Sequence, residues 1–330
     1  MSKISIIGAG SVGATIAYAL LLRRLGSTIS LIDVDQPKCH AQVLDLRDST
    51  FFSESCIIEG TFKDAGQSDI IILTAGAKQK EGETRTDLVE RNYTILKQIL
   101  KQLHPIQKNA ILIIVSNPVD ILTYFAHQLS ELPPSQIIGS GTLLDTMRLR
   151  ADIANILNVS DSSISAYVLG EHGDSQFIPW SSAHLATVNL LTMDPFNHES
   201  KRKEILSRVS SKAYEMIKLK GATYFGIGAC VSRIVEGILL DQQSVWPLSV
   251  LWDGQFNEFH FSGIQSSSNI SRDNKKSICI SLPVVLGRHG ISRRLQVNLN
   301  NEEKENLEKS VDSLRKIISN IENDLSKQQK

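Results

Sequence analysis

The chain has 330 residues, 42% of them hydrophobic, and its 35 Lys and Arg residues are balanced by 35 Asp and Glu residues. A chain of this length buries a large core and should form about two domains, while its balanced charge disfavours nucleic acid or an anionic membrane as a partner. No apolar run reaches the roughly 18 residues of a membrane span, and the first predicted strand begins too early for a signal peptide. The four cysteines form no CxxC pair, so we expect no metal site, no disulfide framework and a cytoplasmic protein that acts on small molecules.

Residues 4–33 predict a βαβ unit. An apolar strand at residues 4–7 runs into the sequence GAGSVG at residues 8–13, and a helical pattern follows at residues 14–25. A second strand at residues 28–32 ends in Asp33. A glycine-rich turn alone is a weak signal, but between a strand and a helix, with a carboxylate about twenty residues later, it predicts a dinucleotide site.

Each glycine of this turn has its own physical reason. Gly8 would make the tight turn, Gly10 would let the backbone approach a pyrophosphate, and Gly13 would let the helix lie close on the sheet. The phosphates would rest on the helix N-terminus, and Asp33 would bind the ribose hydroxyls. Because Asp33 is followed by Val34 with no arginine beside it, the sequence favours NAD over NADP.

Strands and helices keep alternating to about residue 140. Helical patterns at residues 36–46 and 88–103 alternate with wholly apolar runs at residues 69–73 and 111–115, which are typical of parallel strands buried on both faces. This order predicts an α/β fold with a Rossmann-type doubly wound parallel sheet. Ligands bind such sheets beyond the carboxyl ends of the strands. Polar loops fall at these ends at residues 8–13, 74–85 and 116–120.

The second half predicts a mixed α/β catalytic domain, so we divide the chain into an NAD-binding domain, residues 1–141, and a catalytic domain, residues 142–330. Its helical patterns lie at residues 143–157, 201–219 and 307–321, and its strand patterns at residues 164–169, 278–282 and 295–299. Residues 220–228 are rich in glycine and contain Thr223. A polar, serine-rich segment at residues 257–276 predicts a long exposed hairpin or loop.

His172 is the strongest candidate for proton transfer. It lies between Gly170 and Gly173, so the backbone can turn there and present the imidazole to a cleft. An ordinary pKa of about 6.5 suits a group that takes a proton from an alcohol and returns it. Asp145 and Arg148, three residues apart, share one face of a predicted helix. They form either an exposed ion pair or a working set, in which Asp145 orients His172 and Arg148 grips a carboxylate through a bidentate fork.

Two further loops have alternative interpretations. Residues 78–85 are too polar for a core and contain a glycine hinge, so they form either a solvated connection or a loop that closes over substrate and excludes water. Asn117, before Pro118 at the end of a predicted strand, either caps the turn or hydrogen-bonds a substrate oxygen.

The chain contains, in this order, the segments GAGSVG, TAGAKQKEGETR, SNPVD, GSGTLLDTMRLR, GEHGDS and KGATYFGIG. In order and spacing they resemble the lactate/malate dehydrogenase family, and the resemblance covers nearly the whole chain. It implies a Rossmann cofactor domain, a mixed α/β catalytic domain, NAD as the cofactor, a small 2-oxo or 2-hydroxy acid as the substrate, and a homotetramer or homodimer.

The resemblance also implies roles for individual residues. The catalytic residues would be His172 as the acid/base, Asp145 as its partner, and Arg85, which would polarise the reacting carbonyl. The substrate-binding residues would be Gln79, Arg85, Asn117, Arg148 and Thr223. The cofactor-binding residues would be Gly8, Gly10, Val12, Gly13, Asp33, Lys38, Ser116 and Asn117. NADH would give a hydride to the carbonyl carbon of a 2-oxo acid while His172 protonates the oxygen.

Gln79 separates the two branches of the family. Malate dehydrogenases usually carry an arginine there, which pairs with the second carboxylate of oxaloacetate. A glutamine cannot neutralise that charge, so the resemblance favours the interconversion of pyruvate and L-lactate. Two alternatives stay open: another L-2-hydroxy acid dehydrogenase, acting on malate or a branched substrate, and an inactive nucleotide-binding subunit. The retention of Arg85, Asp145, Arg148 and His172 together argues against the second.

Regulation is where the chain departs from part of the family. Many bacterial members bind fructose 1,6-bisphosphate between subunits through an arginine and a histidine. Arg150 matches the arginine, but Ser165 stands at the histidine position and brings no positive charge. We therefore expect activation by this ligand to be weak or absent. Residues 257–276 also look longer than the usual connection, which bears on subunit contacts rather than on chemistry.

Overall fold

The computed structural model describes residues 2–77, 85–253, 259–260 and 277–328. Its main sheet has the strand order β11-β13-β12-β10-β6-β5-β4-β1-β2-β3. The parallel part of the sheet consists of β1 (Lys3–Ile7), β2 (Thr28–Ile32), β3 (Cys56–Glu59), β4 (Ile70–Leu73), β5 (Ile111–Ile114) and β6 (Ile137–Gly139). These strands have the 3-2-1-4-5-6 order of dinucleotide-binding folds, so the predicted Rossmann-type sheet is confirmed.

Helices cover both faces of this sheet. The helices of the first half are α1 (Ser11–Leu22), α2 (Gln36–Arg47), α3 (Phe62–Gly66), α4 (Arg85–Leu103) and α5 (Val119–Leu129). Along β4, Ile71 and Leu73 join the core beneath α4 and α5, whereas Ile70 and Ile72 join the core beneath α1 and α2. Because both faces are buried, successive residues of the strand are all apolar, as the sequence predicted.

Antiparallel strands extend the same sheet into the second half of the chain. Ser249 pairs with Gly139 of β6, which joins the two halves in one sheet. The added strands are β10 (Ser244–Trp252), β11 (Phe259–His260), β12 (Ile278–Gly287) and β13 (Gly290–Arg294). The helices of this half are α6 (Leu143–Leu157), α7 (Glu199–Lys220), α8 (Phe225–Leu239) and α9 (Asn301–Gln328). None of the helices in the described parts of the chain is long and apolar enough to cross a membrane.

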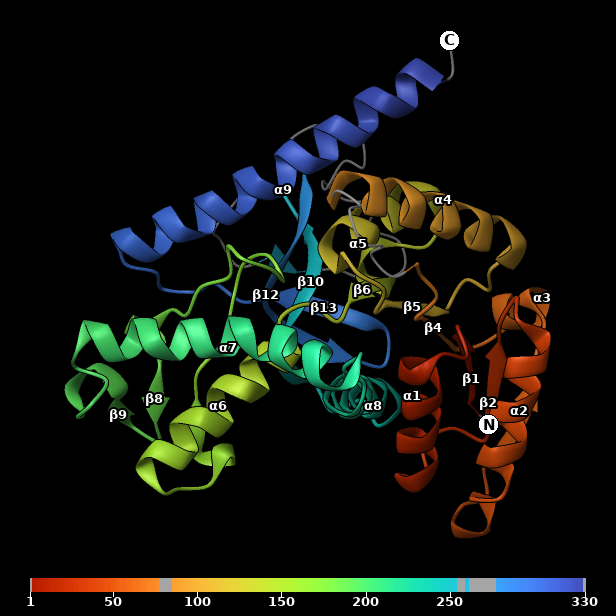
Figure 1. The fold of residues 1–330 in the computed structure, drawn as a ribbon, viewed down its shortest axis with the longest axis horizontal. Helices are drawn as coiled ribbons and strands as arrows, with labels where there is room; N and C mark the ends of the chain where they lie inside the picture. The colour runs from red at the N-terminus through yellow and green to blue at the C-terminus, as the bar shows by residue number, and fades with distance from the viewer. Residues whose placement is uncertain (1, 78–84, 254–258, 261–276, 329–330) are drawn as a thin grey trace.

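The second half spreads around the sheet rather than forming one block (Figure 1). Helix α9 runs along one side and packs against α4, α5 and β12, while α8 lies beside α1. Helices α6 and α7 pack together at the end of the molecule opposite β1 and β2. With them lies a small sheet of β7 (Ile164–Ser165), β8 (His184–Leu185) and β9 (Val188–Asn189).

Strands β5, β4 and β1 are neighbours in the sheet and run parallel, so the loops that follow them meet at one edge. These are the loops in which the sequence placed the glycine turn, the polar segment after residue 73 and the segment at residues 116–120. The predicted helices at residues 36–46, 88–103, 143–157 and 201–219 are also confirmed, as α2, α4, α6 and α7.

Some predicted elements were wrong or missing. The strand predicted at residues 295–299 is not one, because β13 begins at Gly290 and its pairing with β12 ends at Arg294. The alternation of apolar and polar residues there instead reflects an irregular segment, in which Val297 and Leu299 pack on the core. The strand predicted at residues 164–169 ends at Ser165. Helix α8 and strand β10 were not predicted. Of the polar segment at residues 257–276, only β11 lies within the described residues, where it pairs with β13.

Candidate functional site

The glycine turn joins β1 to α1 and combines two tight contacts with one open position. Gly8 has a φ of +110°, and a Cβ there would lie 2.6 Å from Thr74 Oγ1. A Cβ on Gly13 would lie 1.8 Å from the carbonyl oxygen of Gly8. At Gly10, by contrast, a Cβ would meet nothing within 4 Å. Two glycines therefore serve the fold, and Gly10 borders the space that a bound dinucleotide would need.

The N-terminus of α1 faces this open position. Its N-cap residue is Gly10, and no side chain accepts a hydrogen bond at the cap. The first N–H groups of a helix have no partner within the helix and favour an anion, such as a pyrophosphate. Val12, in the first turn, is half-buried against the core of this face. The local structure thus fits a dinucleotide phosphate group.

Asp33 follows β2 and is fixed beside the glycine turn. Its Oδ2 accepts a hydrogen bond from the N–H of Ala9 at 2.7 Å, and its Oδ1 accepts one from the N–H of Asp35 at 3.0 Å. The carboxylate is therefore positioned by backbone groups of two loops, as a ribose-binding group requires. Lys38 is exposed in the first turn of α2, where its N–H donates to Asp35.

The loops after β4 and β5 are tied together. The Ser116 hydroxyl lies 2.6 Å from the carbonyl oxygen of Ala75 and 3.2 Å from that of Leu73. Asn92, buried on α4, accepts from the N–H of Ala77 at 2.7 Å and donates to the carbonyl of Asn117 at 2.8 Å. The side chain of Asn117 is exposed at this edge. Sequence reasoning missed Asn92, whose only signal was a polar residue on the apolar side of a predicted helix.

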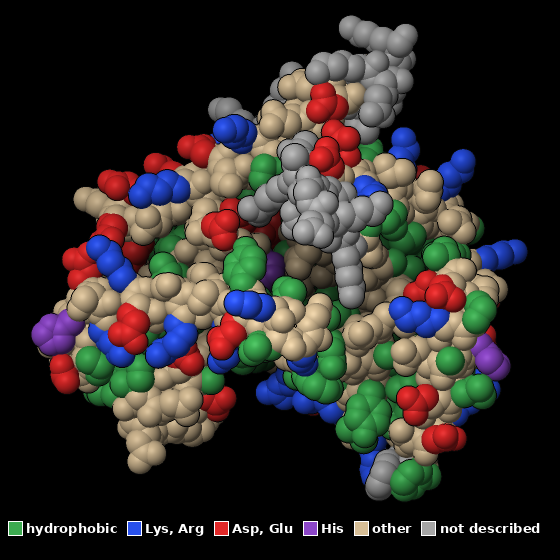
Figure 2. Space-filling model, in the orientation of Figure 1, with side chains coloured by type: hydrophobic (Ala, Val, Ile, Leu, Met, Phe, Trp, Pro, Cys, Tyr) green, Lys and Arg blue, Asp and Glu red, His purple; other side chains and the backbone are tan. Residues whose placement is uncertain are grey.

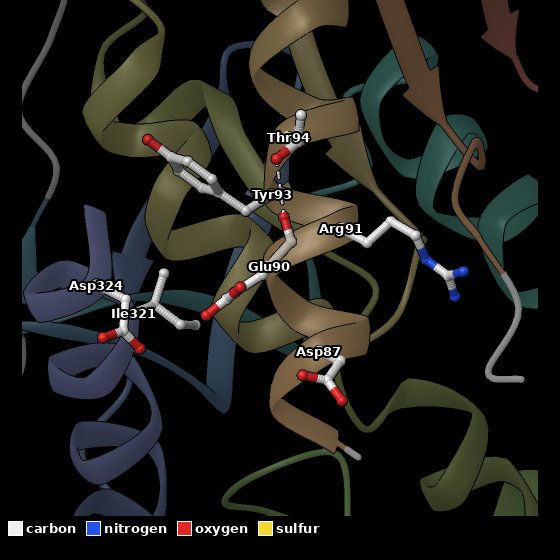
Figure 3. Close-up of a pocket in the computed structure, with 7 residues that line it drawn as sticks. All are labelled: Asp87, Glu90, Arg91, Tyr93, Thr94, Ile321 and Asp324. Carbon is white, nitrogen blue, oxygen red and sulfur yellow. Dashed lines mark hydrogen bonds between the residues drawn. The ribbon is translucent and has the colours of Figure 1, made fainter. Parts of the chain in front are cut away.

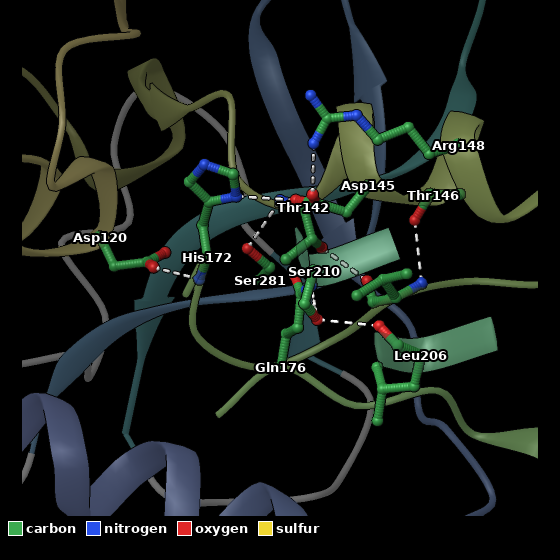
Figure 4. Close-up of polar contacts among 11 residues, drawn as sticks. Asp120, Thr142, Asp145, Thr146, Arg148, His172, Gln176, Leu206, Ser210 and Ser281 are labelled. Atoms are coloured by element: carbon green, nitrogen blue, oxygen red, sulfur yellow. Dashed lines mark hydrogen bonds and ion pairs between the residues drawn. The ribbon is translucent and has the colours of Figure 1, made fainter. Parts of the chain in front are cut away.

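The structure brings His172, Asp145 and Arg148 together (Figure 4). His172 Nδ1 lies 2.7 Å from Asp145 Oδ2, and Arg148 Nη1 donates to Asp145 Oδ1 at 3.2 Å. The side chains of Asp145 and Arg148 are 4% and 9% exposed, so the alternative of an exposed ion pair is wrong. The His172 side chain is 27% exposed, which leaves its ring accessible from outside the cluster.

The charges of this cluster support one another. Burial opposes the charged form of His172, but the Asp145 carboxylate outweighs burial and raises the pKa of the imidazole above its ordinary value. Burial likewise opposes ionisation of Asp145, yet His172 and Arg148 hold the pKa of its carboxyl group below the ordinary value. The arrangement therefore favours a protonated imidazole on an ionised carboxylate, which can release and regain a proton at its other nitrogen.

A second carboxylate, which sequence reasoning did not single out, contacts the same histidine. Asp120, in the first turn of α5, accepts a hydrogen bond from the backbone N–H of His172 at 2.7 Å. It is 2% exposed, and burial raises the pKa of its carboxyl group to about 6. The only signal in the sequence was an acidic residue at the end of the segment SNPVD, next to Asn117 and Pro118.

The other predicted substrate residues are placed only in part. Gln79 belongs to residues 78–84, which lie outside the described residues. Arg85 is the first residue of α4, and its side chain also lies outside what the structure describes. Thr223 is half-buried in the link between α7 and α8. Shortly after it, Gly226 approaches Leu144, so this link lies near the start of α6, where Asp145 is found.

A hollow of about 300 Å³ opens between α4 and α9 (Figure 3). Of the described residues that line it, Asp87, Glu90 and Asp324 carry carboxylates, against one arginine, Arg91. An anionic 2-oxo acid is not favoured among these groups. Across the described parts of the chain, no group of three or more His, Cys, Asp or Glu side chains is arranged to hold a metal ion.

Comparison with known proteins places the chain in a family. Residues 2–139 match the model of the lactate/malate dehydrogenase NAD binding domain, and residues 142–325 match that of the lactate/malate dehydrogenase alpha/beta C-terminal domain. The chain is 42% identical to L-lactate dehydrogenase A of Rhizopus oryzae, over 96% of this chain and 92% of that protein. It is 38% identical to an L-lactate dehydrogenase of Clostridium botulinum, over 97% of this chain and 96% of the other.

Solved structures agree with these relatives. MGS-M5, a lactate dehydrogenase enzyme from a Medee basin deep-sea metagenome library, aligns with a TM-score of 0.88 at 34% identity, covering 97% of this chain and 99% of that one. A minor L-lactate dehydrogenase from Enterococcus mundtii aligns with a TM-score of 0.87 at 34% identity, over 97% and 98% of the two chains. With both halves matched and relatives at this identity along nearly its whole length, the chain belongs to the lactate/malate dehydrogenase family.

Proposed function

We propose that this protein is an NAD-dependent L-lactate dehydrogenase, which interconverts pyruvate and L-lactate. The observation that carries the proposal is the contact between His172 and Asp145, with Arg148 bound to the same buried carboxylate. A 2-oxo acid needs a proton for its carbonyl oxygen and a cation for its carboxylate, and this cluster offers both. The four relatives described above are named L-lactate or lactate dehydrogenases, which supports the same activity.

The bound cofactor would supply and accept the hydride at the reacting carbon. His172 would protonate the carbonyl oxygen during pyruvate reduction and take the proton back during lactate oxidation. Asp145 would hold the imidazole in one orientation and stabilise its charged form. Arg148 uses one terminal nitrogen on Asp145, and its other nitrogens point away from that carboxylate, where they are suited to a substrate carboxylate (Figure 4).

Further residues complete the proposed site. Arg85 would polarise the carbonyl, Asn117 would contact the same oxygen, Thr223 would line the pocket, and Gln79 would leave no cation for a second carboxylate. The NAD site is proposed to consist of the glycine turn with Asp33, Lys38, Ser116 and Asn117. Within the turn, Gly8 and Gly13 would allow the close packing that shapes the site, while Gly10 and Val12 would border the cofactor. The open space at Gly10 and the fixed carboxylate of Asp33 fit this cofactor. We also propose that the functional division of the chain falls at residues 1–141 and 142–330.

The protein is proposed to act in the cytoplasm as a homo-oligomer, a tetramer or a dimer. Large apolar side chains are exposed on helices that lie at the surface, where a second copy would cover them. They are Tyr18 and Leu22 on α1, Leu44 on α2, Tyr214, Ile217 and Leu219 on α7, and Phe225 on α8. Figure 2 shows hydrophobic side chains at the surface over α1 and α8, among charges of both signs.

A panel of 2-oxo acids tests the activity. Oxidation of NADH would be followed by absorbance with pyruvate, oxaloacetate and branched 2-oxo acids, and again with NADPH in place of NADH. We expect pyruvate with NADH to give the highest kcat/KM. A higher value for oxaloacetate or a branched acid would assign the enzyme to another 2-hydroxy acid, and no turnover with any of them would contradict the proposal.

A further inference from the structure

The backbone of the loop that carries His172 is held by acceptors of two kinds. The N–H of Gly170 donates to the carbonyl of Ser281 at 3.1 Å, and the N–H of Glu171 donates to the hydroxyl of Ser310 at 3.3 Å. Both acceptors are neutral. The N–H of His172 instead donates to a carboxylate, Asp120, at 2.7 Å. Of these three N–H groups, that of His172, the proposed proton carrier, donates to a charged acceptor.

Asp120 comes from the other half of the chain. It lies in the first turn of α5, three residues after Asn117, whereas His172 lies beyond α6. Figure 4 shows its carboxylate on the backbone side of His172, while Asp145 receives the imidazole ring. The histidine is therefore held at two points by two carboxylates, one on the ring and one on the main chain.

The hydrogen bond from the His172 N–H does not by itself explain why residue 120 is an aspartate. Asp120 Oδ1 is buried, and no hydrogen bond of good geometry reaches it among the described residues. The Ser249 hydroxyl is its nearest source of support and lowers the pKa of the Asp120 carboxyl group, but burial outweighs it. An asparagine has the same shape, and its oxygen could accept the same N–H while its amide donated to a neighbour. A buried, half-satisfied charge is costly, so the charge itself needs a reason.

The charge acts on the imidazole. Among the groups around His172, both Asp145 and Asp120 raise the pKa of the ring, whereas burial and Arg148 lower it. Among the described side chains, the ionisable groups that face these two are Asp145 and Arg148 beside His172, Glu171 and Cys279 beside Asp120, and Cys230 beside Asp145. Burial raises the pKa of both thiols, that of Cys230 to about 12, so neither thiol titrates near neutral pH.

We propose that Asp120 is a positioning residue for His172, which fixes its main chain and favours the protonated imidazole through its negative charge. The inference rests on the proposed function, because it assigns a part to a residue that touches the acid/base and not the substrate. Asp120 thereby links the cofactor half of the chain to the proton carrier of the catalytic half.

The test compares the two directions of the reaction in Asp120→Asn. This variant keeps an acceptor for the His172 N–H and removes the charge, so the pKa of His172 should fall. At a pH near that of the transition, the protonated fraction of the ring should fall by about three- to tenfold. Pyruvate reduction needs the protonated ring, so its rate falls at alkaline pH. In the variant, this falling limb of the pH–rate profile should move to lower pH. Lactate oxidation needs the neutral ring, so its rising limb should move to lower pH as well.

The two directions thus change in opposite senses at a fixed pH between the old and new limbs, with reduction slower and oxidation faster. A loss of structure alone would slow both. Glu303→Gln is the matched control, because Glu303 is a buried carboxylate that accepts the N–H of Ser181 at 2.9 Å and does not face His172. Its pH profiles should equal those of the wild type.

Thermal unfolding gives a second readout. Burial raises the pKa of the Asp120 carboxyl group to about 6 in the folded protein. The stability that this group contributes is therefore fully present at a pH below its unfolded pKa and is lost as the pH rises through about 6. At pH 7 the Asn variant should therefore have a Tm equal to or above that of the wild type. A stable variant whose limbs stay in place, or whose two directions fall equally, overturns the proposal.

A measurement on the wild type covers the case in which Asp120→Asn does not fold. The signals of the His172 ring would be followed by NMR during a pH titration. We expect an additional inflection when Asp120 protonates, at a pH above the ordinary range of a carboxyl group because burial raises its pKa. Its absence overturns the proposal. These outcomes differ from a failure of the proposed function, which would appear as wild-type protein without turnover of pyruvate.

Discussion

The proposed cofactor side of the site is made of backbone and open space, whereas the proposed substrate side is made of buried charge. On the first side, Gly8 and Gly13 allow close contacts, and Gly10 leaves room beside a helix N-terminus. On the second side, His172 and Asp145 form a contact that depends on their ionisation. The difference predicts which substitutions impair each side. On the cofactor side these are substitutions that add atoms, and on the substrate side they are substitutions that remove a proton-carrying or charged group.

The largest effect is expected from His172→Asn, which removes the proposed proton carrier and keeps a similar volume. General acid–base groups contribute about 10²–10⁴-fold, so turnover with pyruvate should fall by about that factor. NADH affinity, measured by fluorescence titration, should stay close to that of the wild type, because the glycine turn is untouched. His198→Asn, at an exposed histidine paired with Asp194, is the control and should keep full activity. A His172 variant with a tenth of wild-type turnover would show that another group carries the proton.

The contrast between the two sides also explains what the sequence could predict. The glycine turn, its strand and Asp33 are close together in the chain, so their spacing alone indicates a site. His172 and Asp145 are 27 residues apart. The residues alone left their pairing as one of two alternatives, and the family resemblance then implied it. Asp120 and Asn92 act on the backbone of distant segments, 52 and 25 residues away. When a side chain binds a main-chain group, any residue type can stand at the partner position. The sequence then shows no pair of complementary side chains from which the contact could be predicted.

The fold shows the same limit at α8. Its first turns contain Gly226 and Gly228, which have low helix propensity and suggested only a glycine-rich segment. In the structure, a Cβ on Gly228 would lie 2.6 Å from Thr15 Cγ2 of α1. The glycines therefore allow two helices to pack closely, and tertiary packing overrides the local preference. The apolar strands β4 and β5 were predictable because burial on both faces leaves a continuous apolar run.

A change of charge at Gln79 sharpens the contrast on the substrate side. Gln79→Arg should shift preference from pyruvate toward oxaloacetate, because a guanidinium can pair with the second carboxylate. A hydrogen bond to a charged group contributes about 1.5–3 kcal/mol, which corresponds to about ten- to a hundredfold in the ratio of the two kcat/KM values. Gln102→Arg, which adds the same charge on the exposed side of α4, should leave the ratio unchanged. An unchanged ratio in Gln79→Arg would mean that this residue does not line the pocket.

Two glycine variants break the cofactor side in different ways. Gly13→Ala should destabilise the fold by about 1–3 kcal/mol, because its Cβ would overlap the carbonyl oxygen of Gly8. Gly10→Ala should leave the Tm unchanged, since its Cβ meets nothing, but should weaken NADH binding by filling the space beside the helix N-terminus. Thermal unfolding and NADH titration of both variants separate the two effects. Equal Tm losses in both would contradict the assignment of Gly10 to the cofactor and Gly13 to the fold.

The smallest effect is expected from fructose 1,6-bisphosphate, which tests whether charge is also arranged outside the proposed site. Arg150 Nε donates to the carbonyl of Ala166 at 3.0 Å, and its guanidinium lies 4.9 Å from the ring centroid of Tyr167. The exposed Ser165 beside them adds no charge, although His184 pairs with it across β7 and β8.

Allosteric coupling is typically about 5–150-fold, and we expect millimolar ligand to change the pyruvate concentration for half-maximal rate by less than about threefold. Ser165→His should increase the response by adding a titratable cation next to Arg150. A response of about tenfold in the wild type would show that another cationic group compensates for the missing histidine.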